Sequence, residues 1–152
     1  MKLSGFTDKK LVDLGIAART KDDLISRMVD LLGRSPKIKD KAAFLRDVRA
    51  REALVPTGVG YGVGFPHAKS DAATSVVFAV GRADTGIDFE ALDKEPVRLV
   101  FLIAAPKGEE PSRVYLNLMA RLSFLMKDQA NRKRLLTTDS VADVMALLDS
   151  ID

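Results

Sequence analysis

Two short apolar runs restrict the possible fold of this chain more than any other feature. The segments 75–80 (SVVFAV) and 97–104 (VRLVFLIA) are rich in β-branched and aliphatic residues, and both are predicted to be strands. Side chains alternate between the two faces of a sheet, so a strand that is apolar at successive positions must be covered on both sides. We therefore expect a single α/β domain, with a central mixed β-sheet and helices packed on both faces.

Four segments have the spacing of amphipathic helices, in which apolar residues recur every three or four positions. The first begins after the capping residue Thr20, and Gly33 follows it where a helix end favours a left-handed residue. The second runs from about residue 40 to 51, the third crosses 114–125, and the last begins after Ser140. Their expected apolar faces are Leu24, Met28, Leu31 and Leu32; Phe44, Leu45 and Val48; Val114 or Tyr115, with Leu118, Leu122 and Leu125; and Val141, Val144, Met145 and Leu148.

The remaining segments are predicted to connect these strands and helices. Residues 11–17 are typical of a short strand or an extended segment, 84–96 of a loop or irregular hairpin, and 106–112 of a loop. The chain contains no internal repeat and no linker-like stretch, so we expect residues 1–152 to form one domain.

Composition excludes several classes of protein. The chain has no cysteine, and therefore no disulfide, thiolate nucleophile or thiolate metal site. No apolar run approaches the ~18 residues that span a bilayer, and the N-terminus lacks the pattern of a signal peptide, so we expect a cytoplasmic protein without membrane insertion. The net charge of +3 is small, and the basic stretch 131–134 is typical of a solvated helix face, so nucleic acid is not an expected partner.

A glycine-rich segment contains the chemically interesting part of the sequence. Glycine occupies every second position from Gly58 to Gly64, which matches neither a dinucleotide fingerprint nor a P-loop. In an extended strand this spacing would leave one face bare for the approach of another backbone or a partner, and would direct the side chains of 59, 61, 63 and 65 into the core. A crowded bend or a bulge-rich strand is the alternative interpretation.

The segment ends at His67, the only histidine of the chain. Pro66 fixes its own φ and favours an extended conformation at Phe65, so the direction of the His67 side chain is restricted. A neutral imidazole is a good nucleophile near neutral pH. A single histidine without cysteine does not supply the three or four ligands of a zinc site, so we expect neither a metal nor another cofactor.

The segment from Arg51 to His67 resembles the signature R-E-x-x-x-x-T-G-x-G-x-G-x-x-x-P-H. This signature belongs to the type-2 enzyme IIA domains of the bacterial phosphoenolpyruvate-dependent phosphotransferase system, from its fructose, mannitol and nitrogen-regulatory branch. The blocks 86–97 and 100–106 are similar to the next two blocks of the family, and the resemblance extends from about residue 11 to 148.

The resemblance implies a phosphotransferase that works as a phosphohistidine relay. A histidine-containing phosphocarrier protein would donate a phosphoryl group to Nε2 of His67, and Arg51 would stabilise the phosphate. The group would then pass to an enzyme IIB domain or serve as a regulatory mark read by a target protein. Gly58 and Gly60 are expected to support the site, and the Thr57 hydroxyl would either bind the phosphate or cap the turn.

One position departs from the family pattern. Many members have a second histidine near the first, and Tyr115 occupies the corresponding position here, where it could donate a hydrogen bond or simply pack at a helix start. The chain has no attached transporter segment, which favours a nitrogen-regulatory IIA protein. The alternatives are a fructose- or mannitol-type IIA component of sugar transport, and a non-catalytic regulatory module on the same fold.

Overall fold

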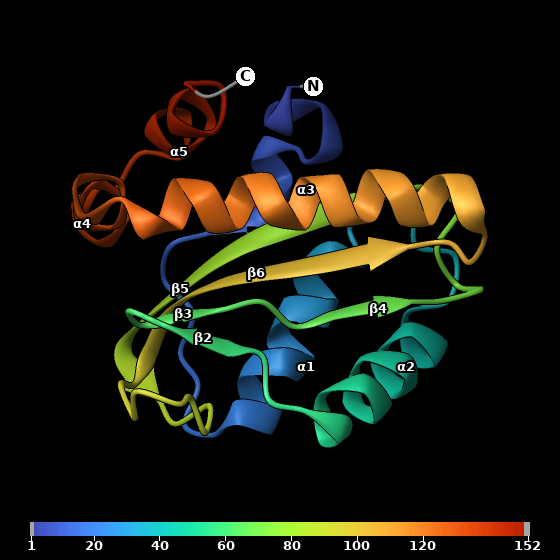
Figure 1. Ribbon diagram of the computed structural model, residues 1–152, viewed down its shortest axis with the longest axis horizontal. Coiled ribbons are helices and arrows are strands. Elements are labelled where there is room, and N and C mark those ends of the chain that lie inside the picture. The colour runs from blue at the N-terminus through green and yellow to red at the C-terminus, as the bar shows by residue number, and fades with distance from the viewer. Residues whose placement is uncertain (1, 151–152) are drawn as a thin grey trace.

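The computed structural model describes residues 2–150, which form one mixed sheet covered by helices on both faces (Figure 1). The strands are β1 (Val12–Asp13), β2 (Gly58–Gly60), β3 (Val63–Gly64), β4 (His67–Lys69), β5 (Val77–Ile87) and β6 (Val97–Ala105). Their order is β1-β5-β6-β3-β2, and β4 also pairs with β6. The pairs β5–β6 and β2–β3 are antiparallel, whereas β1–β5, β3–β6 and β4–β6 are parallel. The predicted fold class is confirmed.

The helices divide between the two faces of this sheet. Helices α1 (Lys21–Leu32) and α2 (Lys41–Leu54) lie on one side, as Figure 1 shows. Helices α3 (Glu109–Lys127), α4 (Gln129–Thr137) and α5 (Val141–Leu148) lie on the other, with short 3-10 turns at Leu3–Phe6 and Lys9–Leu11. No helix within residues 2–150 combines the length and the apolar character needed to cross a membrane.

Strand β6 explains why both faces are covered. Val97, Val100, Leu102 and Ala104 belong to the core beneath α1 and α2, whereas Leu99, Phe101, Ile103 and Ala105 belong to the core beneath α3. Each of these side chains is at most 1% exposed. The apolar run 97–104 was therefore correctly interpreted as a strand buried on two sides.

The predicted helix starts are confirmed, and α1 ends just before Gly33 as predicted, but the left-handed conformation expected for this glycine is wrong. The Thr20 hydroxyl accepts the Asp23 N–H at 3.1 Å, and the Ser140 hydroxyl accepts the Asp143 N–H at 3.3 Å. Gly33 is right-handed, with φ −63° and ψ −10°. A Cβ at Gly33 would lie 2.7 Å from Cδ of Lys41, so the Lys41 side chain of α2 lies directly over this glycine.

Several predicted boundaries also shift. Strand β5 continues to Ile87, because its antiparallel partner β6 extends the pairing as far as Ile87–Val97, and the hairpin interpretation of this region is the correct one. Helix α2 continues to Leu54, three residues beyond the predicted end. The loop predicted for 106–112 ends at Gly108, since Pro111 lies in the first turn of α3, where a missing N–H costs no helical hydrogen bond. Within 11–17, only Val12–Asp13 pair as a strand.

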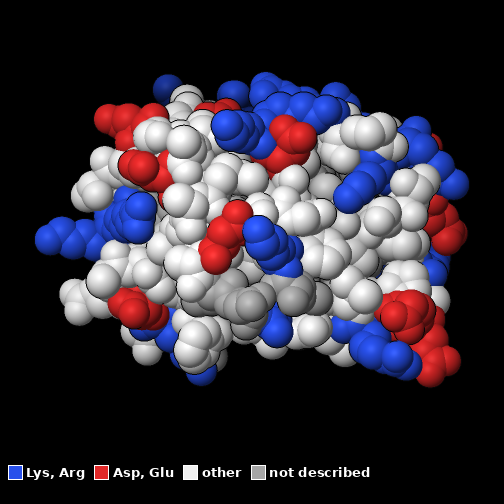
Figure 2. All heavy atoms as spheres, turned by 90° about the horizontal axis from the view of Figure 1, so that it is seen from above, with Lys and Arg blue, Asp and Glu red and all other residues white. Residues whose placement is uncertain are grey.

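The basic stretch 131–134 lies in α4, and part of it has a structural role. Nη1 of Arg132 donates to the carbonyl oxygens of Met126 and Lys127, and Nδ2 of Asn131 donates to that of Leu125. These bonds satisfy the last carbonyl groups of α3. On the face formed by the C-terminal helices, Figure 2 shows basic and acidic side chains interspersed among uncharged ones.

Candidate functional site

The glycine-rich segment folds into a tight hairpin, not into one extended strand. Strands β2 and β3 pair antiparallel, with a register irregularity between Gly58 and Gly60. The chain reverses at Gly60, Tyr61 and Gly62, which have φ values of 96°, 60° and 76°. The extended-strand interpretation is therefore wrong, and the interpretation as a crowded bend with a bulge is correct. The physical reason is that consecutive left-handed residues turn the backbone back on itself.

The loop 88–96 covers the glycines of this hairpin. A Cβ at Gly58 would lie 2.9 Å from Cβ of Ala91, and one at Gly60 would lie 3.1 Å from Oδ2 of Asp93. The Tyr61 N–H donates to the same Oδ2 at 2.9 Å. The bare face expected from the sequence is thus filled by the chain itself, and the glycines permit this close intramolecular contact.

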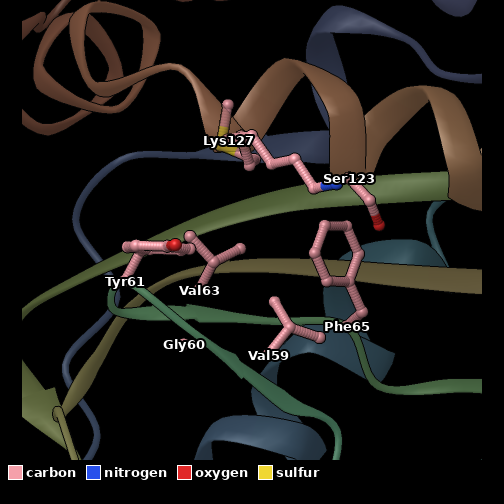
Figure 3. A pocket seen from close by; sticks show the side chains of 8 residues that line it. Val59, Gly60, Tyr61, Val63, Phe65, Ser123 and Lys127 are labelled. Atoms are coloured by element: carbon pink, nitrogen blue, oxygen red, sulfur yellow. The ribbon is translucent and has the colours of Figure 1, made fainter. Parts of the chain in front are cut away.

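The other side of the hairpin lies against α3. An apolar pocket of about 240 Å³ is lined there by Val59, Gly60, Tyr61, Val63 and Phe65, together with Ser123, Met126 and Lys127 of α3 (Figure 3). Val63 and Phe65 are buried as expected, whereas Val59 and Tyr61 are 54% and 63% exposed. The expectation that all four side chains enter the core is therefore wrong for Val59, which lies in strand β2, and for Tyr61, which lies at the turn.

His67 is the first residue of β4 and is half-buried. Its Nδ1 lies 2.7 Å from the carbonyl oxygen of Phe65. A carbonyl oxygen only accepts, so Nδ1 carries the proton and the lone pair is on Nε2. Burial is the largest influence and lowers the pKa of His67; the hydrogen bond to the Phe65 carbonyl opposes it, the charge of Arg51 lowers the pKa further, and the charge of Glu52 raises it slightly. The imidazole is therefore neutral near pH 7, with a nucleophilic Nε2.

His67 opens into a surface depression of about 450 Å³ between α2, β4 and the start of α3. Two predicted site residues, Arg51 and Tyr115, line the depression together with His67. The Tyr115 ring lies edge-on to the imidazole, with 5.7 Å between ring centroids and 62° between the planes. Burial raises the pKa of the Tyr115 hydroxyl, which is therefore a protonated donor near neutral pH.

The other three predicted residues do not line this depression. The Thr57 side chain is buried, and its hydroxyl donates to Glu52, which also accepts the Thr57 N–H at 2.7 Å. Gly58 and Gly60 shape the hairpin that precedes β4. These three residues are thus connected to His67 through the backbone.

Sequence reasoning missed several residues of the depression. Lys69 follows His67 by two positions in a strand, so both lie on the same side of β4, and this spacing was a usable signal. Asp47 precedes Arg51 by four positions on α2, which is likewise a same-face spacing. Lys107 reaches the depression from the loop after β6, and no sequence pattern indicated that. Within residues 2–150, no group of three or more potential metal-ligating side chains comes together.

Comparison with known proteins places this site in a family. Residues 5–151 match the family described as phosphoenolpyruvate-dependent sugar phosphotransferase system, EIIA 2. The chain is 35% identical over 149 residues to the fructose-specific EIIA component of Haloferax volcanii, covering 95% of this chain and 94% of that protein. It is 33% identical over 152 residues to the fructose-specific EIIABC component of Bacillus subtilis, matching all of this chain but only 24% of that longer protein.

A solved structure agrees with these relatives. The nitrogen regulatory protein IIA-Ntr of Neisseria meningitidis superposes with a TM-score of 0.89 at 25% identity, covering 96% of this chain and 98% of that one. The family match, the relatives and the fold all confirm the resemblance seen in the sequence. The chain therefore belongs to the type-2 EIIA family of the phosphoenolpyruvate-dependent phosphotransferase system, a family of phosphoryl-transfer components.

Proposed function

We propose that this chain carries a phosphoryl group on Nε2 of His67, in a relay between proteins. The observation that carries the proposal is the contact of Nδ1 with the Phe65 carbonyl oxygen at 2.7 Å. This contact leaves the Nε2 lone pair available, in a depression that Arg51 also lines. A fixed neutral imidazole beside a planar cation is the arrangement that phosphoryl transfer needs.

The chemical step is a displacement at phosphorus. The Nε2 lone pair attacks the phosphorus of a phosphohistidine on the donor; the new N–P bond forms as the donor's N–P bond breaks, and that bond's electron pair returns to the donor nitrogen. The positive charge that develops on the His67 ring is stabilised by the Phe65 carbonyl, to which Nδ1–H donates. Arg51 offers donors to the phosphoryl oxygens, and the protonated Tyr115 hydroxyl offers another.

The surroundings of the depression suit a protein donor. Leu54 and Leu116 line it and are 78% and 62% exposed, and neighbouring Val55 is 59% exposed. Exposed apolar side chains around a reactive group favour docking of another protein surface. We propose a histidine-containing phosphocarrier protein as the donor, and an enzyme IIB domain or a regulated target protein as the acceptor.

Two uses of the phosphoryl group are proposed, each favoured by a different observation. The TM-score of 0.89 with a nitrogen regulatory IIA protein favours a regulatory mark. The 35% identity to a fructose-specific EIIA component of nearly the same length favours sugar transport. Offering the phosphorylated protein to a fructose-type enzyme IIB separates them, because transfer supports the transport role. Phosphorylation-dependent binding of a target without transfer supports the regulatory role. The cytoplasmic location expected from the sequence stays a prediction.

The primary test is incubation with phosphoenolpyruvate, enzyme I and a histidine phosphocarrier, followed by mass spectrometry. Since His67 is the only histidine, a phosphohistidine can form only there, and His67→Gln should abolish the acid-labile adduct without loss of the fold. If no cognate carrier yields the adduct, the relay is refuted and the non-catalytic regulatory module becomes the better interpretation.

A further inference from the structure

A continuous series of hydrogen bonds joins His67 to a buried ion pair behind it. Nδ1 of His67 lies 2.7 Å from the carbonyl oxygen of Phe65, and the Phe65 N–H donates to the carbonyl oxygen of Thr57 at 3.0 Å. The Thr57 N–H and hydroxyl both donate to the carboxylate of Glu52. Nζ of Lys21 lies 2.8 Å from the same carboxylate. The imidazole is thus connected to α1 and α2 through two backbone carbonyl groups.

The carboxylate of Glu52 is the last acceptor in this series of hydrogen bonds, and it is held firmly in place. Glu52 is only 7% exposed, and both of its oxygens accept hydrogen bonds. Lys21, which neutralises it, is the first residue of α1, and its Nζ also lies 5.1 Å from the ring centroid of Phe89 in the loop 88–96. Moving the Glu52 carboxylate away from these partners would leave a buried charge uncompensated, at a high cost in free energy. The carboxylate therefore stays in this position.

The same turn of α2 also holds Arg51. Successive helical residues point about 100° apart, so Arg51 lines the depression of His67 while its neighbour Glu52 is buried against Lys21. Nη1 of Arg51 donates to the carbonyl oxygen of Val55 at 3.2 Å. The segment 55–57 is therefore attached to Arg51 at one end and to Glu52 at the other.

We propose that Glu52 is a positioning residue for phosphoryl transfer, which sets the tautomer and the orientation of the His67 imidazole through Thr57 and Phe65. The inference rests on the proposed role of His67 as phosphoryl acceptor. Displacement of the Phe65 carbonyl removes the acceptor of Nδ1–H, and the tautomer protonated on Nε2 then competes. A ring protonated on Nε2 has no lone pair there to attack phosphorus.

The test compares three variants by two measurements. Glu52→Gln keeps the shape of the side chain but removes its charge, and Thr57→Val replaces the hydroxyl with a methyl group of similar size. Asp40→Ala is the matched control, because Asp40 caps the opposite end of the same helix by accepting the Ala43 N–H at 3.0 Å. The first measurement is the ¹⁵N chemical shifts of the His67 ring, free of overlap because the chain has one histidine. The second is the rate of phosphoryl acceptance from the carrier.

The expected result separates positioning from simple stability. The unaltered protein and Asp40→Ala should show the Nδ1-protonated tautomer and equal rates of acceptance. Glu52→Gln should show a mixture of tautomers and a rate about tenfold to a hundredfold lower. Thr57→Val should shift the tautomer balance in the same direction but less. If Glu52→Gln does not fold, the tautomer and rate of Thr57→Val test the positioning role instead.

The contrary results are equally distinct. If the folded variants keep the Nδ1-protonated tautomer, and any loss of rate equals that of Asp40→Ala, then Glu52 serves stability alone and the inference is overturned. If the unaltered protein accepts no phosphoryl group, the proposed function fails. The chemical shifts would still report whether Glu52 sets the tautomer in that case.

Discussion

Replacing Gly58 with alanine tests whether the hairpin glycines serve packing within the chain or contact with a partner. The added Cβ would lie 2.9 Å from Cβ of Ala91, 3.2 Å from its Cα, and 3.3 Å from Cβ of Phe89. Ordinary carbon contacts are about 3.5–4.0 Å, so the hairpin and the loop 88–96 must separate by about 0.6–1 Å. None of these atoms can rotate away, because each belongs to the backbone or is attached directly to it.

The cost can be estimated from this displacement. Overpacking of a filled interior costs about 1–3 kcal/mol, and the lower entropy of the unfolded alanine variant returns about 0.4–1 kcal/mol. We therefore expect Gly58→Ala to lower the free energy of unfolding by about 1–2 kcal/mol. For a chain of this size the loss corresponds to a Tm lower by about 2–8 °C.

Thermal and urea denaturation of the purified variant measure this loss. Gly5→Ala is the control, because a Cβ at Gly5 meets no atom within 4 Å, and it should leave Tm essentially unchanged. A Tm for Gly58→Ala equal to that of the unaltered protein would refute the packing argument. Normal stability combined with lost phosphoryl acceptance would instead show that Gly58 faces a partner.

Of four further predictions, three concern the site and one concerns a buried arginine away from it. Because burial lowers the pKa of His67, an NMR titration should give a midpoint below 6.5, and a midpoint at or above 6.5 would contradict the burial argument. The folded state then binds this proton less readily than the unfolded chain, so the protein should lose stability relative to His67→Gln as pH falls below 6.5, with no such difference at pH 8. Arg51→Lys keeps the charge but loses the planar fork, and phosphoryl acceptance should fall about tenfold to a hundredfold, as loss of about 1.5–3 kcal/mol implies; an unchanged rate would exclude a fork-like contact. Arg82 is buried and donates to the carbonyl oxygen of Leu135, so Arg82→Met should cost about 1–3 kcal/mol in urea denaturation while acceptance by the folded protein is retained.

Much of the fold was predictable because it depends on short-range patterns. Burial of β6 on both faces follows from its apolar residues 99–105, and the caps at Thr20 and Ser140 involve N–H groups only three residues away. His67 and Arg51 were predictable as site residues from the family signature, and their common depression agrees with that prediction. Interactions within a few residues leave their trace in local spacing, which a reader of the sequence can recognise.

Other features depend on contacts between distant segments. The turn at Tyr61 is held by Asp93, 32 residues later, and the glycine at position 58 permits the close approach of Ala91 from the loop 88–96. Alternating glycines are compatible with an extended strand or with a hairpin, and packing against the loop 88–96 selects the hairpin.

The sequence by itself determined the layered α/β fold and the family, and it indicated His67 as the candidate phosphoryl acceptor. The family resemblance already implied Nε2 of His67, but only the tertiary structure shows what keeps that nitrogen free, namely the Phe65 carbonyl beside Nδ1 and the hydrogen bond that Phe65 makes to Thr57. It also decided that the Thr57 hydroxyl binds Glu52. The physical reason is that a hydrogen bond needs a defined distance and direction between two groups, and residue spacing constrains neither once the chain has reversed at Tyr61.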